Sequence, residues 1–304
     1  MTVYWRSLVE GRRSNPLLLG GLRALSHLYG LGLRCRRRQP VRAGLPVVSV
    51  GNVAVGGTGK TPLVMALCEQ VKELQVAVWS RFQDEARLIA QRCPWVQVIS
   101  GPRRSVEGQL LILDDGLQQP DLDVDLQIVV LDGANPWGSG RLLPAGLLRE
   151  PLQALERAHF VVVTRQLPER FEEQLRRYTA APWVAMGVEP SCRLQGMRLG
   201  ALCAIGQPEQ FYQMVEGQGA QLVARWSLPD HSAFEGSALE RFVHRCEQAG
   251  AQAIVCTEKD AVKLTTPLRL PLVPIPIRLK PLANEPVWEA LVAKMKFLVQ
   301  HGPP

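Results

Sequence analysis

The 304-residue sequence predicts an α/β protein built on a doubly wound, mainly parallel sheet, followed by a second and smaller α/β domain. From about residue 45, short apolar runs alternate with segments of helical periodicity, which is typical of βαβ units. A glycine-rich turn joins the first apolar run to the first helical segment, and the alternation begins again after about residue 180. The hydrophobic content of 46% and the charged content of 21% are those of a folded protein, so the composition excludes global disorder.

The first α/β domain is expected over residues 41–185. In a doubly wound sheet the ligand binds beyond the carboxyl ends of the strands, so the residues after each strand are the first candidates for a site. The expected strands are Pro46–Val50, Val76–Trp79, Val96–Ile99, Leu110–Leu113, Leu126–Leu131 and Phe160–Val163, and the expected helices are Pro62–Leu74 and Glu85–Arg92.

The second domain is expected over residues 186–304, with the boundary in the proline-bearing stretch Pro182–Pro190. Its apolar runs again alternate with helical stretches, which predicts a smaller parallel sheet. The expected strands are Ala201–Ile205, Gln221–Ala224, Ala253–Cys256 and Leu272–Ile277, and the expected helices include Ala238–Ala249 and Val287–Val299.

Residues 1–40 form a third region, which is apolar and basic. The apolar stretch 16–33 carries Arg23 near its middle and is flanked by arginines on both sides. A membrane-spanning helix needs roughly 20 mostly apolar residues, and Arg23 argues against one. We predict an amphipathic helix that lies on an anionic membrane surface. The alternative is a helix packed on the core of the protein with a solvated basic tail.

The formal net charge of +7 favours an anionic partner, such as a membrane surface, a phosphorylated substrate or nucleic acid. Nucleic acid is not expected, because no aromatic stacking pattern or reading motif accompanies the arginines. The seven cysteines are scattered without a C-x-x-C pair, which indicates reduced thiols and neither a zinc site nor a disulfide framework.

The glycine-rich turn has the order of a P-loop. The apolar run Val47–Val50 leads into the turn, and a helical segment opens with Lys60 and Thr61. Glycine lets backbone N–H groups approach phosphate oxygens, and the positive end of the new helix points at the same oxygens. Lys60 is expected to reach the β- and γ-phosphates of a nucleoside triphosphate and Thr61 to ligate Mg²⁺. The predicted phosphate-binding residues are Gly56, Gly57, Thr58, Gly59, Lys60 and Thr61.

Acidic residues follow two of the expected strands. Asp114 and Asp115 follow Leu110–Leu113, which is how a Walker-B element presents an acid to the Mg²⁺ of a nucleotide. Asp132 follows Leu126–Leu131 in the same way, so this signal alone is ambiguous. The alternative for either site is an aspartate that caps a helix or makes a turn.

Three further stretches carry candidate residues. Arg141, Arg149 and Glu150 lie among glycines and prolines, which favours a rigid loop that faces phosphate or sugar over a plain connecting loop. His231 follows Pro229-Asp230, although nothing local marks it as catalytic. In Thr257–Lys263, the threonine and the acid after it are also explained as a helix N-cap and a first-turn charge.

Taken together, these stretches resemble the tetraacyldisaccharide 4′-kinases, the lipid A 4′-kinases of Gram-negative bacteria. The stretches Gly140–Gly146 and Thr257–Lys263 are far more specific than the P-loop alone. The matching pieces follow the order of the family and cover most of the chain: Val50–Asn52 with Gly56–Pro62, Asp114–Gln118, Gly140–Gly146, Leu148–Pro151, Pro229–His231 and Thr257–Lys263.

The resemblance implies two Rossmann-like α/β domains, Mg²⁺-ATP as the donor, and transfer of the γ-phosphoryl group to the 4′-hydroxyl of a tetraacyldisaccharide 1-phosphate. It also implies a membrane-associating amino-terminal helix and a place at the cytoplasmic face of the bacterial inner membrane.

By motif position, the resemblance gives roles to single residues. Lys60 and Thr61 are the nucleotide and Mg²⁺ ligands, Asp114 and Asp115 form the acidic pair, and Glu150 is the loop acid. Asp84 is the catalytic base, assisted by His231, because a sugar hydroxyl needs a proton acceptor as phosphorus is attacked. The expected catalytic residues are thus Lys60, Asp84, Asp115 and His231; the expected metal ligands are Thr61, Asp114 and Glu150; and the expected acceptor-binding residues are Asp114, Asp115, Arg141, Arg149 and Glu150.

The chain departs from the family pattern on the acceptor side. It runs directly from Ser80–Phe82 into Gln83–Glu85, without the glycine-rich loop usual at this point, and Gln119 replaces a usual histidine. Three alternatives therefore stay open. They are a P-loop kinase of a different glycolipid, a nucleotide-dependent regulator or metallochaperone-like GTPase, and a nucleic-acid-binding module. The second is weakened because the sequence has no Asn-Lys-x-Asp tetrad.

Overall fold

The computed structural model describes residues 5, 9, 15–35, 40–101, 106–119, 121–229, 232–264 and 266–302. Contacts divide the chain into two compact units. The larger unit comprises Met1–Arg81, Arg92–Val188 and Leu279–Pro304, and the smaller unit comprises Phe82–Gln91 and Glu189–Arg278.

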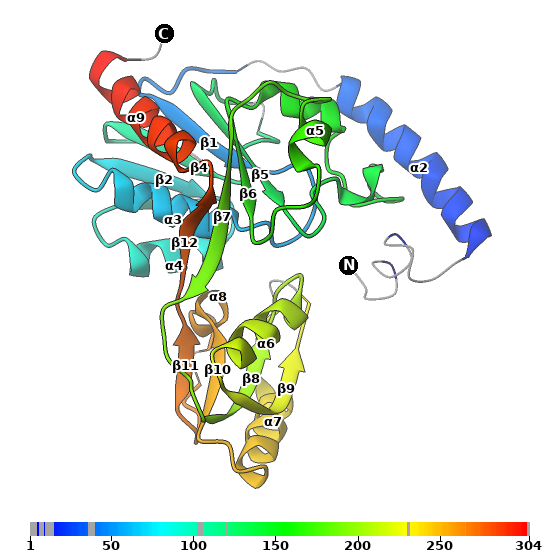
Figure 1. Cartoon of the computed structure of the whole chain (residues 1–304), viewed down its shortest axis with the longest axis vertical. Helices are drawn as coiled ribbons and strands as arrows, with labels where there is room; N and C mark the ends of the chain where they lie inside the picture. The colour runs from blue at the N-terminus through cyan, green and yellow to red at the C-terminus, as the bar shows by residue number, and fades with distance from the viewer. Residues whose placement is uncertain are drawn as a thin grey trace. The chain divides into compact units, whose positions relative to one another are not determined.

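The larger unit is organised around an eight-stranded sheet with the order β12-β7-β6-β5-β1-β4-β2-β3 (Figure 1). Its strands are β1 (Val47–Gly51), β2 (Val76–Ser80), β3 (Gln97–Ser100), β4 (Leu110–Asp114), β5 (Leu126–Asp132), β6 (Phe160–Thr164), β7 (Trp183–Pro190) and β12 (Ile277–Ala283). The pairs from β3 through to β7 are all parallel. The predicted α/β fold with a mainly parallel sheet is confirmed.

The central strands β1, β4, β5 and β6 are buried along their whole length. Parallel strands that are covered on both faces have continuous apolar sequences. These four strands were therefore predicted from their apolar runs. The helices of this unit include α2 (Pro16–Cys35), α3 (Lys60–Gln70), α5 (Phe171–Leu175) and α9 (Glu285–His301), together with the 3-10 helices η1 (Gly138–Gly140) and η2 (Leu152–Arg157). The strand order reverses at β1, and the ligand site of such a sheet lies at this point.

The smaller unit has a four-stranded parallel sheet in the order β11-β10-β8-β9. Its strands are β8 (Arg198–Cys203), β9 (Gln221–Ser227), β10 (Ala253–Thr257) and β11 (Leu272–Ile275), and its helices are α4 (Gln83–Arg92), α6 (Pro208–Gly217), α7 (Gly236–Gln248) and α8 (Glu258–Ala261). Neighbouring residues of β8 belong to two different cores. Leu202 packs in a cluster with Phe242 of α7, and Ala201 in a cluster with Phe211 of α6. Because successive side chains of a strand point to opposite faces, the sheet is covered by helices on both sides.

The two units differ from the predicted domains 41–185 and 186–304, because the last residues of the chain belong to the larger unit. The stretch expected to be an interdomain boundary, Pro182–Pro190, is largely strand β7 of the larger sheet. The single strand expected at Leu272–Ile277 is divided into β11 and β12, and β12 and α9 return to the larger unit. Strand pairing between segments about 100 residues apart decides this return, and local periodicity does not report it.

Helix α2 lies against the loop that carries the predicted substrate-binding residues. Ser26 is buried, donates a hydrogen bond to the Leu142 carbonyl at 2.8 Å and accepts one from the Ala145 N–H at 2.9 Å. Tyr29 donates to the Arg149 carbonyl at 2.9 Å. One side of the predicted amino-terminal helix is therefore packed on its own protein.

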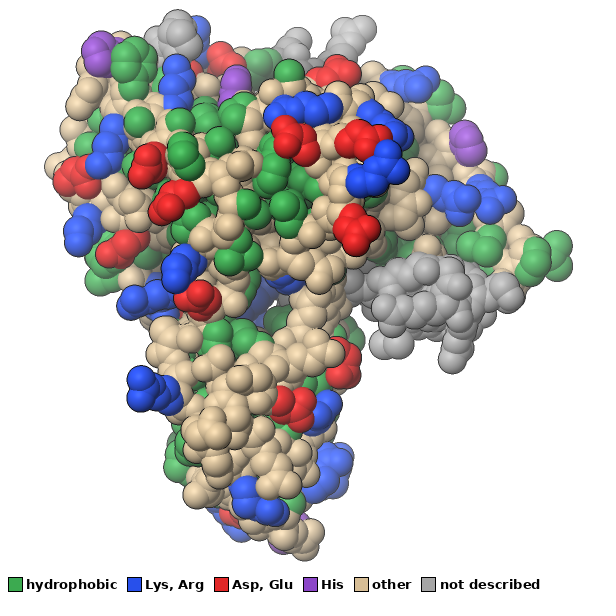
Figure 2. Space-filling view, in the orientation of Figure 1, with side chains coloured by type: hydrophobic (Ala, Val, Ile, Leu, Met, Phe, Trp, Pro, Cys, Tyr) green, Lys and Arg blue, Asp and Glu red, His purple; other side chains and the backbone are tan. Residues whose placement is uncertain are grey.

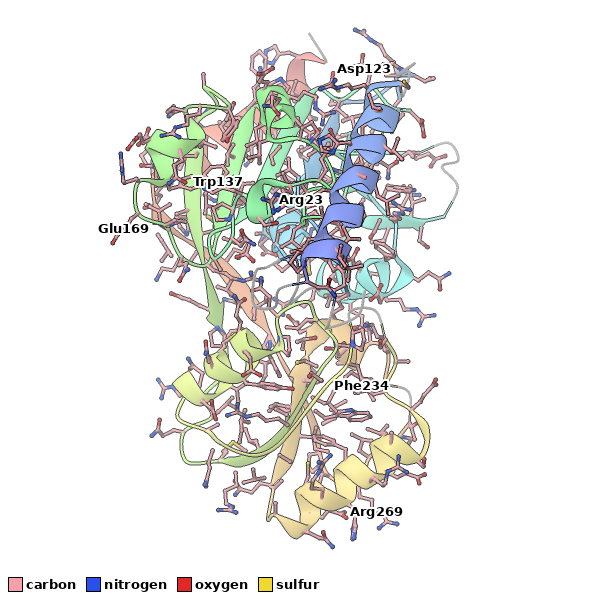
Figure 3. The ribbon with its side chains drawn as sticks, turned by 90° about the vertical axis from the view of Figure 1, so that its right-hand side faces the viewer. Arg23, Asp123, Trp137, Glu169, Phe234 and Arg269 are labelled. Atoms are coloured by element: carbon pink, nitrogen blue, oxygen red, sulfur yellow. The ribbon has the colours of Figure 1, made fainter. Side chains whose placement is uncertain are left out.

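The outward side of α2 is apolar and basic. Arg23 projects from the helix (Figure 3), and both hydrophobic and basic side chains are exposed along it in the space-filling view (Figure 2). Several leucines are more than half exposed: Leu17, Leu25, Leu28 and Leu31. Within the described part of the chain, no helix has the length and hydropathy needed to span a bilayer.

Candidate active site

The P-loop of the larger unit connects β1 to α3. Gly56 and Gly59 both have positive φ, at 131° and 86°. A Cβ atom on Gly59 would lie 3.0 Å from Cγ2 of Thr164, so both the backbone conformation and the space require glycine at this position. Lys60 and Thr61 then form the first turn of α3, which directs its backbone N–H groups and its positive end toward the loop.

Polar contacts within the P-loop and from one other segment hold its conformation. The buried Asn52 side chain donates to the Ala54 carbonyl and, at 3.1 Å, to Thr58 Oγ1. The N–H of Val55 donates to the Leu147 carbonyl at 2.8 Å, and the N–H of Arg149 donates to the Val53 carbonyl at 2.7 Å. The predicted Arg141–Glu150 loop is therefore a structural support of the phosphate loop.

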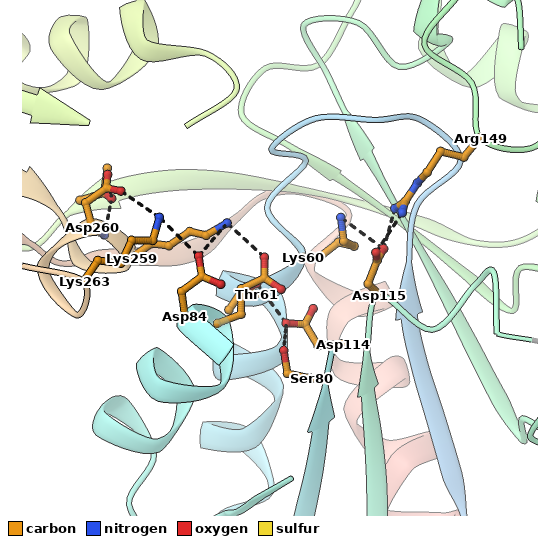
Figure 4. A network of polar contacts seen from close by, with 12 residues as sticks. Lys60, Thr61, Ser80, Asp84, Asp114, Asp115, Arg149, Lys259, Asp260 and Lys263 are labelled. Carbon is orange, nitrogen blue, oxygen red and sulfur yellow. Dashed lines mark hydrogen bonds and ion pairs between the residues drawn. The ribbon is translucent and has the colours of Figure 1, made fainter. Parts of the chain in front are cut away.

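Thr61 and Asp114 come together as predicted for a magnesium site (Figure 4). Thr61 Oγ1 donates to Asp114 Oδ2 at 3.1 Å, and Ser80 Oγ lies 3.4 Å from the same oxygen. These are hard oxygen donors, which suit Mg²⁺. The described residues contain no group of three or more His, Cys, Asp or Glu side chains that could hold a metal ion. Mg²⁺ bound with a nucleotide also takes water and phosphate oxygens as ligands.

Asp115 is held by two cations. Arg149 donates two hydrogen bonds to its carboxylate, at 2.6 and 2.9 Å, and Lys60 Nζ lies 3.5 Å away (Figure 4). Burial by itself raises the pKa of Asp115, but the Lys60 ammonium and the Arg149 guanidinium outweigh it and lower the pKa to about 2. Asp115 is therefore a carboxylate at neutral pH, and it fixes both cations beside the P-loop.

The other two residues predicted on the loop behave differently from each other. Glu150 is buried, and its carboxylate is bound by the Arg157 guanidinium. Arg141 is exposed. Their roles toward a metal or a substrate stay predictions.

The carboxyl ends of β5 and β6 bring a further arginine to the P-loop. Arg165 donates to the Gly57 carbonyl with one guanidinium nitrogen and to Asp132 Oδ2 with another. Thr164 Oγ1 donates to the Thr58 carbonyl at 2.8 Å. The role of Asp132 was ambiguous from the sequence, and Arg165 was not predicted. The only available signal was its position directly after a buried strand.

Asp84, the predicted base, lies in the first turn of α4 and belongs to the smaller unit. Its Oδ2 atom is 3.4 Å from Lys263 Nζ and 3.7 Å from Lys259 Nζ (Figure 4), and its side chain is only 13% exposed. Lys259 also lies 3.2 Å from Glu85 Oε1. The Lys259 and Lys263 side chains therefore surround the Asp84 carboxylate, a contact that the sequence did not predict.

The stretch Thr257–Lys263 also has a structural role of its own. The Thr257 side chain accepts a hydrogen bond from the Asp260 N–H at 3.1 Å and so caps α8. This N-cap was predicted from the sequence as the structural explanation of Thr257. The fully buried Asp260 accepts from the Ala204 N–H at 2.9 Å and lies 3.3 Å from Lys263 Nζ. His231, the predicted assistant of the base, lies outside the described residues.

A P-loop at the reversal point of a parallel sheet, with a strand-end acid beside its hydroxyl residue, defines a nucleoside-triphosphate-binding protein of the P-loop class. Comparison with known proteins narrows this class. The family profile described as tetraacyldisaccharide-1-P 4′-kinase (LpxK) matches residues 20–82 and 80–296. The chain belongs to this family.

Two curated relatives and one solved structure show how far the similarity extends. The tetraacyldisaccharide 4′-kinase of Anaeromyxobacter sp. (strain K) is 36% identical over 283 residues, which is 75% of this chain and 75% of the relative. The enzyme of the same name from Geobacter sulfurreducens is 34% identical and covers 95% of this chain and 98% of its own length. The crystal structure of LpxK from Aquifex aeolicus in complex with ATP has a TM-score of 0.70 at 26% identity, over 91% of this chain and 99% of that one.

Proposed function

We propose that this protein transfers the γ-phosphoryl group of ATP to the 4′-hydroxyl of tetraacyldisaccharide 1-phosphate, which forms lipid IVA in lipid A biosynthesis. The observation that carries the proposal is the complete phosphate cradle in a chain of this family. Gly59, Lys60 and Thr61 begin α3, and Asp114 and Asp115 stand beside them at the end of β4. That the Aquifex aeolicus relative has been crystallised with ATP supports ATP as the donor.

On the donor side, backbone N–H groups of the P-loop and Lys60 bind the triphosphate oxygens. Asp115 holds Lys60 in position through the ion pair at 3.5 Å, and Arg149 fixes the Asp115 carboxylate. Mg²⁺, when bound, supplies positive charge that offsets the charge on the transferring group. Thr61 and Asp114 would hold this ion, and Glu150 is the third proposed ligand.

On the acceptor side, Asp84 takes the proton of the sugar hydroxyl as its oxygen attacks phosphorus. Lys259 and Lys263 contact the Asp84 carboxylate and restrict its position. His231 is proposed to share or orient this proton. No covalent phosphoenzyme is needed in this scheme.

The membrane-facing part of the proposal rests on α2. Its outward leucines are suited to the acyl region at a bilayer surface, and Arg23 and Arg34 to anionic headgroups. We therefore propose that the enzyme is peripheral, at the cytoplasmic face of the inner membrane, where a water-soluble nucleotide and an anchored glycolipid are both accessible. Helix α2 also contacts the Arg141–Glu150 loop, so the proposed membrane-binding helix and the loop that supports the P-loop are in contact within one unit.

A different glycolipid acceptor is the second candidate. It is favoured by one observation: β2 ends at Ser80 and α4 begins at Gln83, so no glycine-rich loop separates them. The loop is missing just before the proposed base, where an acceptor would be recognised.

The test is phosphate transfer by the purified full-length protein from Mg²⁺-ATP to tetraacyldisaccharide 1-phosphate in detergent micelles. The Asp84→Asn variant should lose transfer while keeping ATP affinity, and the Lys60→Met variant should lose both. Arg177→Met is a matched control, because Arg177 is an exposed residue on the surface of the larger unit. Wild-type protein that binds ATP but transfers no phosphate to this lipid would refute the proposal, and transfer to another glycolipid would then favour the second candidate.

A further inference from the structure

Arg165 occupies an unusual position at the edge of the P-loop. It is the first residue after β6 and has φ of 75°, a left-handed backbone that residues other than glycine rarely adopt. Its N–H donates to the Met186 carbonyl at 2.8 Å, which keeps this backbone next to β7. About 26% of its side chain stays exposed although the guanidinium binds both Asp132 and the Gly57 carbonyl. The strained backbone thus delivers a planar cation to the rim of the phosphate loop.

The strand order tells on which side of the P-loop a nucleoside must lie. β1, which leads into the loop, has β4 on one side and then β2, and it has β5 and β6 on the other. Asp114, the last residue of β4, accepts a hydrogen bond from Thr61, and Asp115, the next residue, pairs with Lys60. Because Thr61 and Lys60 are the proposed ligands of Mg²⁺ and of the terminal phosphates, the γ-phosphate end of a triphosphate is on that side. A triphosphate is a linear chain, and its nucleoside end must therefore extend the opposite way, toward the ends of β5 and β6, where Arg165 lies.

We propose that Arg165 is the stacking platform for the nucleobase of the bound nucleotide, and that Asp132 and the Gly57 carbonyl fix its guanidinium plane. This inference rests on the proposed function only in that the site binds ATP. A guanidinium stacks on an aromatic ring through its flat face and keeps its N–H groups free for hydrogen bonds in the plane. Two in-plane partners, one on β5 and one in the P-loop, therefore hold the face in a fixed direction while the edges are engaged.

The same arrangement explains why this position favours stacking over reading of the base edge. The two carboxylate oxygens of Asp132 accept from Arg165 and, at 3.1 Å, from the Ala134 N–H. The next side chain on this segment beyond Gln166 is Leu167, which is apolar and 43% exposed. Arg165 supplies affinity for the aromatic ring of the base. Its contact with the Gly57 carbonyl fixes the position of the guanidinium plane relative to the P-loop.

The test compares a ligand that has a base with one that lacks it. Calorimetry measures the dissociation constants of Mg²⁺-ATP and of inorganic tripolyphosphate with Mg²⁺ for the wild-type protein, Arg165→Lys and Arg165→Gly. Lysine keeps a cation for Asp132 and Gly57 without the planar face, and glycine accepts φ of 75° without strain. Arg177→Met, on the surface of the same unit, controls for the loss of one positive charge.

Both Arg165 variants should bind ATP about 3- to 30-fold more weakly than the wild type, and Arg165→Lys should bind tripolyphosphate within about twofold of the wild type. An equal loss for ATP and tripolyphosphate in Arg165→Lys would overturn the proposal, because Arg165 would then only support the P-loop. Unchanged ATP affinity in both variants would overturn it as well. Wild-type protein that binds ATP but does not phosphorylate the lipid would refute the proposed function alone, and wild-type protein that binds neither ligand would refute both.

Discussion

Replacing Arg149 by methionine tests the buried charge cluster around Asp115. Arg149 is 19% exposed and gives two short hydrogen bonds to Asp115, whose side chain is 6% exposed. Methionine keeps much of the length of the side chain and removes the charge. The buried Asp115 carboxylate then retains Lys60, at 3.5 Å, as its charged partner among the contacts that the structure records.

The expected loss of stability is about 2–3 kcal/mol at neutral pH. Removing one partner of a buried ion pair costs about 3–5 kcal/mol, and the remaining lysine offsets part of this cost. For a unit of about 200 residues this loss lowers the melting temperature by about 4–12 °C.

The effect should depend on pH in a defined direction. The pKa of Asp115 in the folded protein is about 2, below its ordinary value of 3.8, so its ionised form favours folding by about 2 kcal/mol. This contribution is complete above about pH 4 and is lost as the pH falls toward 2. Arg149→Met raises the folded pKa, so the melting temperatures of the variant and the wild type should converge as the pH is lowered from 5 toward 3.

Differential scanning calorimetry from pH 7 to pH 3 measures this effect. Arg177→Met controls for the loss of an exposed arginine, and a double-mutant cycle with Asp115→Asn isolates the pair, with an expected coupling of about 2 kcal/mol. A variant that melts within about 1 °C of the wild type at pH 7 would refute the reasoning, and so would a difference that is constant over the pH range.

Three further predictions follow from other parts of the structure. Gly59→Ala should weaken ATP binding roughly tenfold, because φ of 86° and the 3.0 Å approach to Thr164 force the loop to shift; unchanged affinity in calorimetry would contradict this. Asp260→Ala should destabilise the smaller unit by about 3 kcal/mol, because it removes a fully buried carboxylate from Lys263 and the Ala204 N–H; urea unfolding measures the loss, and an unchanged midpoint would show that the contacts contribute nothing. Leu28→Asp should leave the melting temperature unchanged, since Leu28 is 63% exposed, but should weaken binding to anionic vesicles about tenfold in a sedimentation assay; equal sedimentation of the two proteins would argue against α2 as the membrane contact.

The parts of the site that local sequence predicted are those that one segment builds alone. The P-loop is a strand, a turn and a helix in one continuous stretch, so Lys60 and Thr61 were predicted from their spacing and from the need for glycine in the turn. Asp114 was predicted because a buried strand ends at it. The contact between Thr61 and Asp114 at 3.1 Å follows from the parallel pairing of β1 with β4, which brings the two strand ends to the same edge of the sheet.

The parts that sequence did not predict are contacts between distant segments. Arg165 reaches Gly57 across 108 positions, and Lys259 reaches Glu85 across 174. The assignment of β12 and α9 to the larger unit is of the same kind. Periodicity and motif spacing report local conformation and cannot report which distant side chains meet.

The sequence by itself determined the class of the fold, the phosphate loop and the family, because continuous apolar strands, a glycine turn and ordered motifs are local properties. Only the tertiary structure decided which charges are paired. It surrounded Asp115 with Lys60 and Arg149, and Asp84 with Lys259 and Lys263. It also brought Arg165 to the P-loop. The physical reason is that a buried charge must find its partner in space, and the folded sheet, with its strand ends gathered at one edge, determines which partners are within reach.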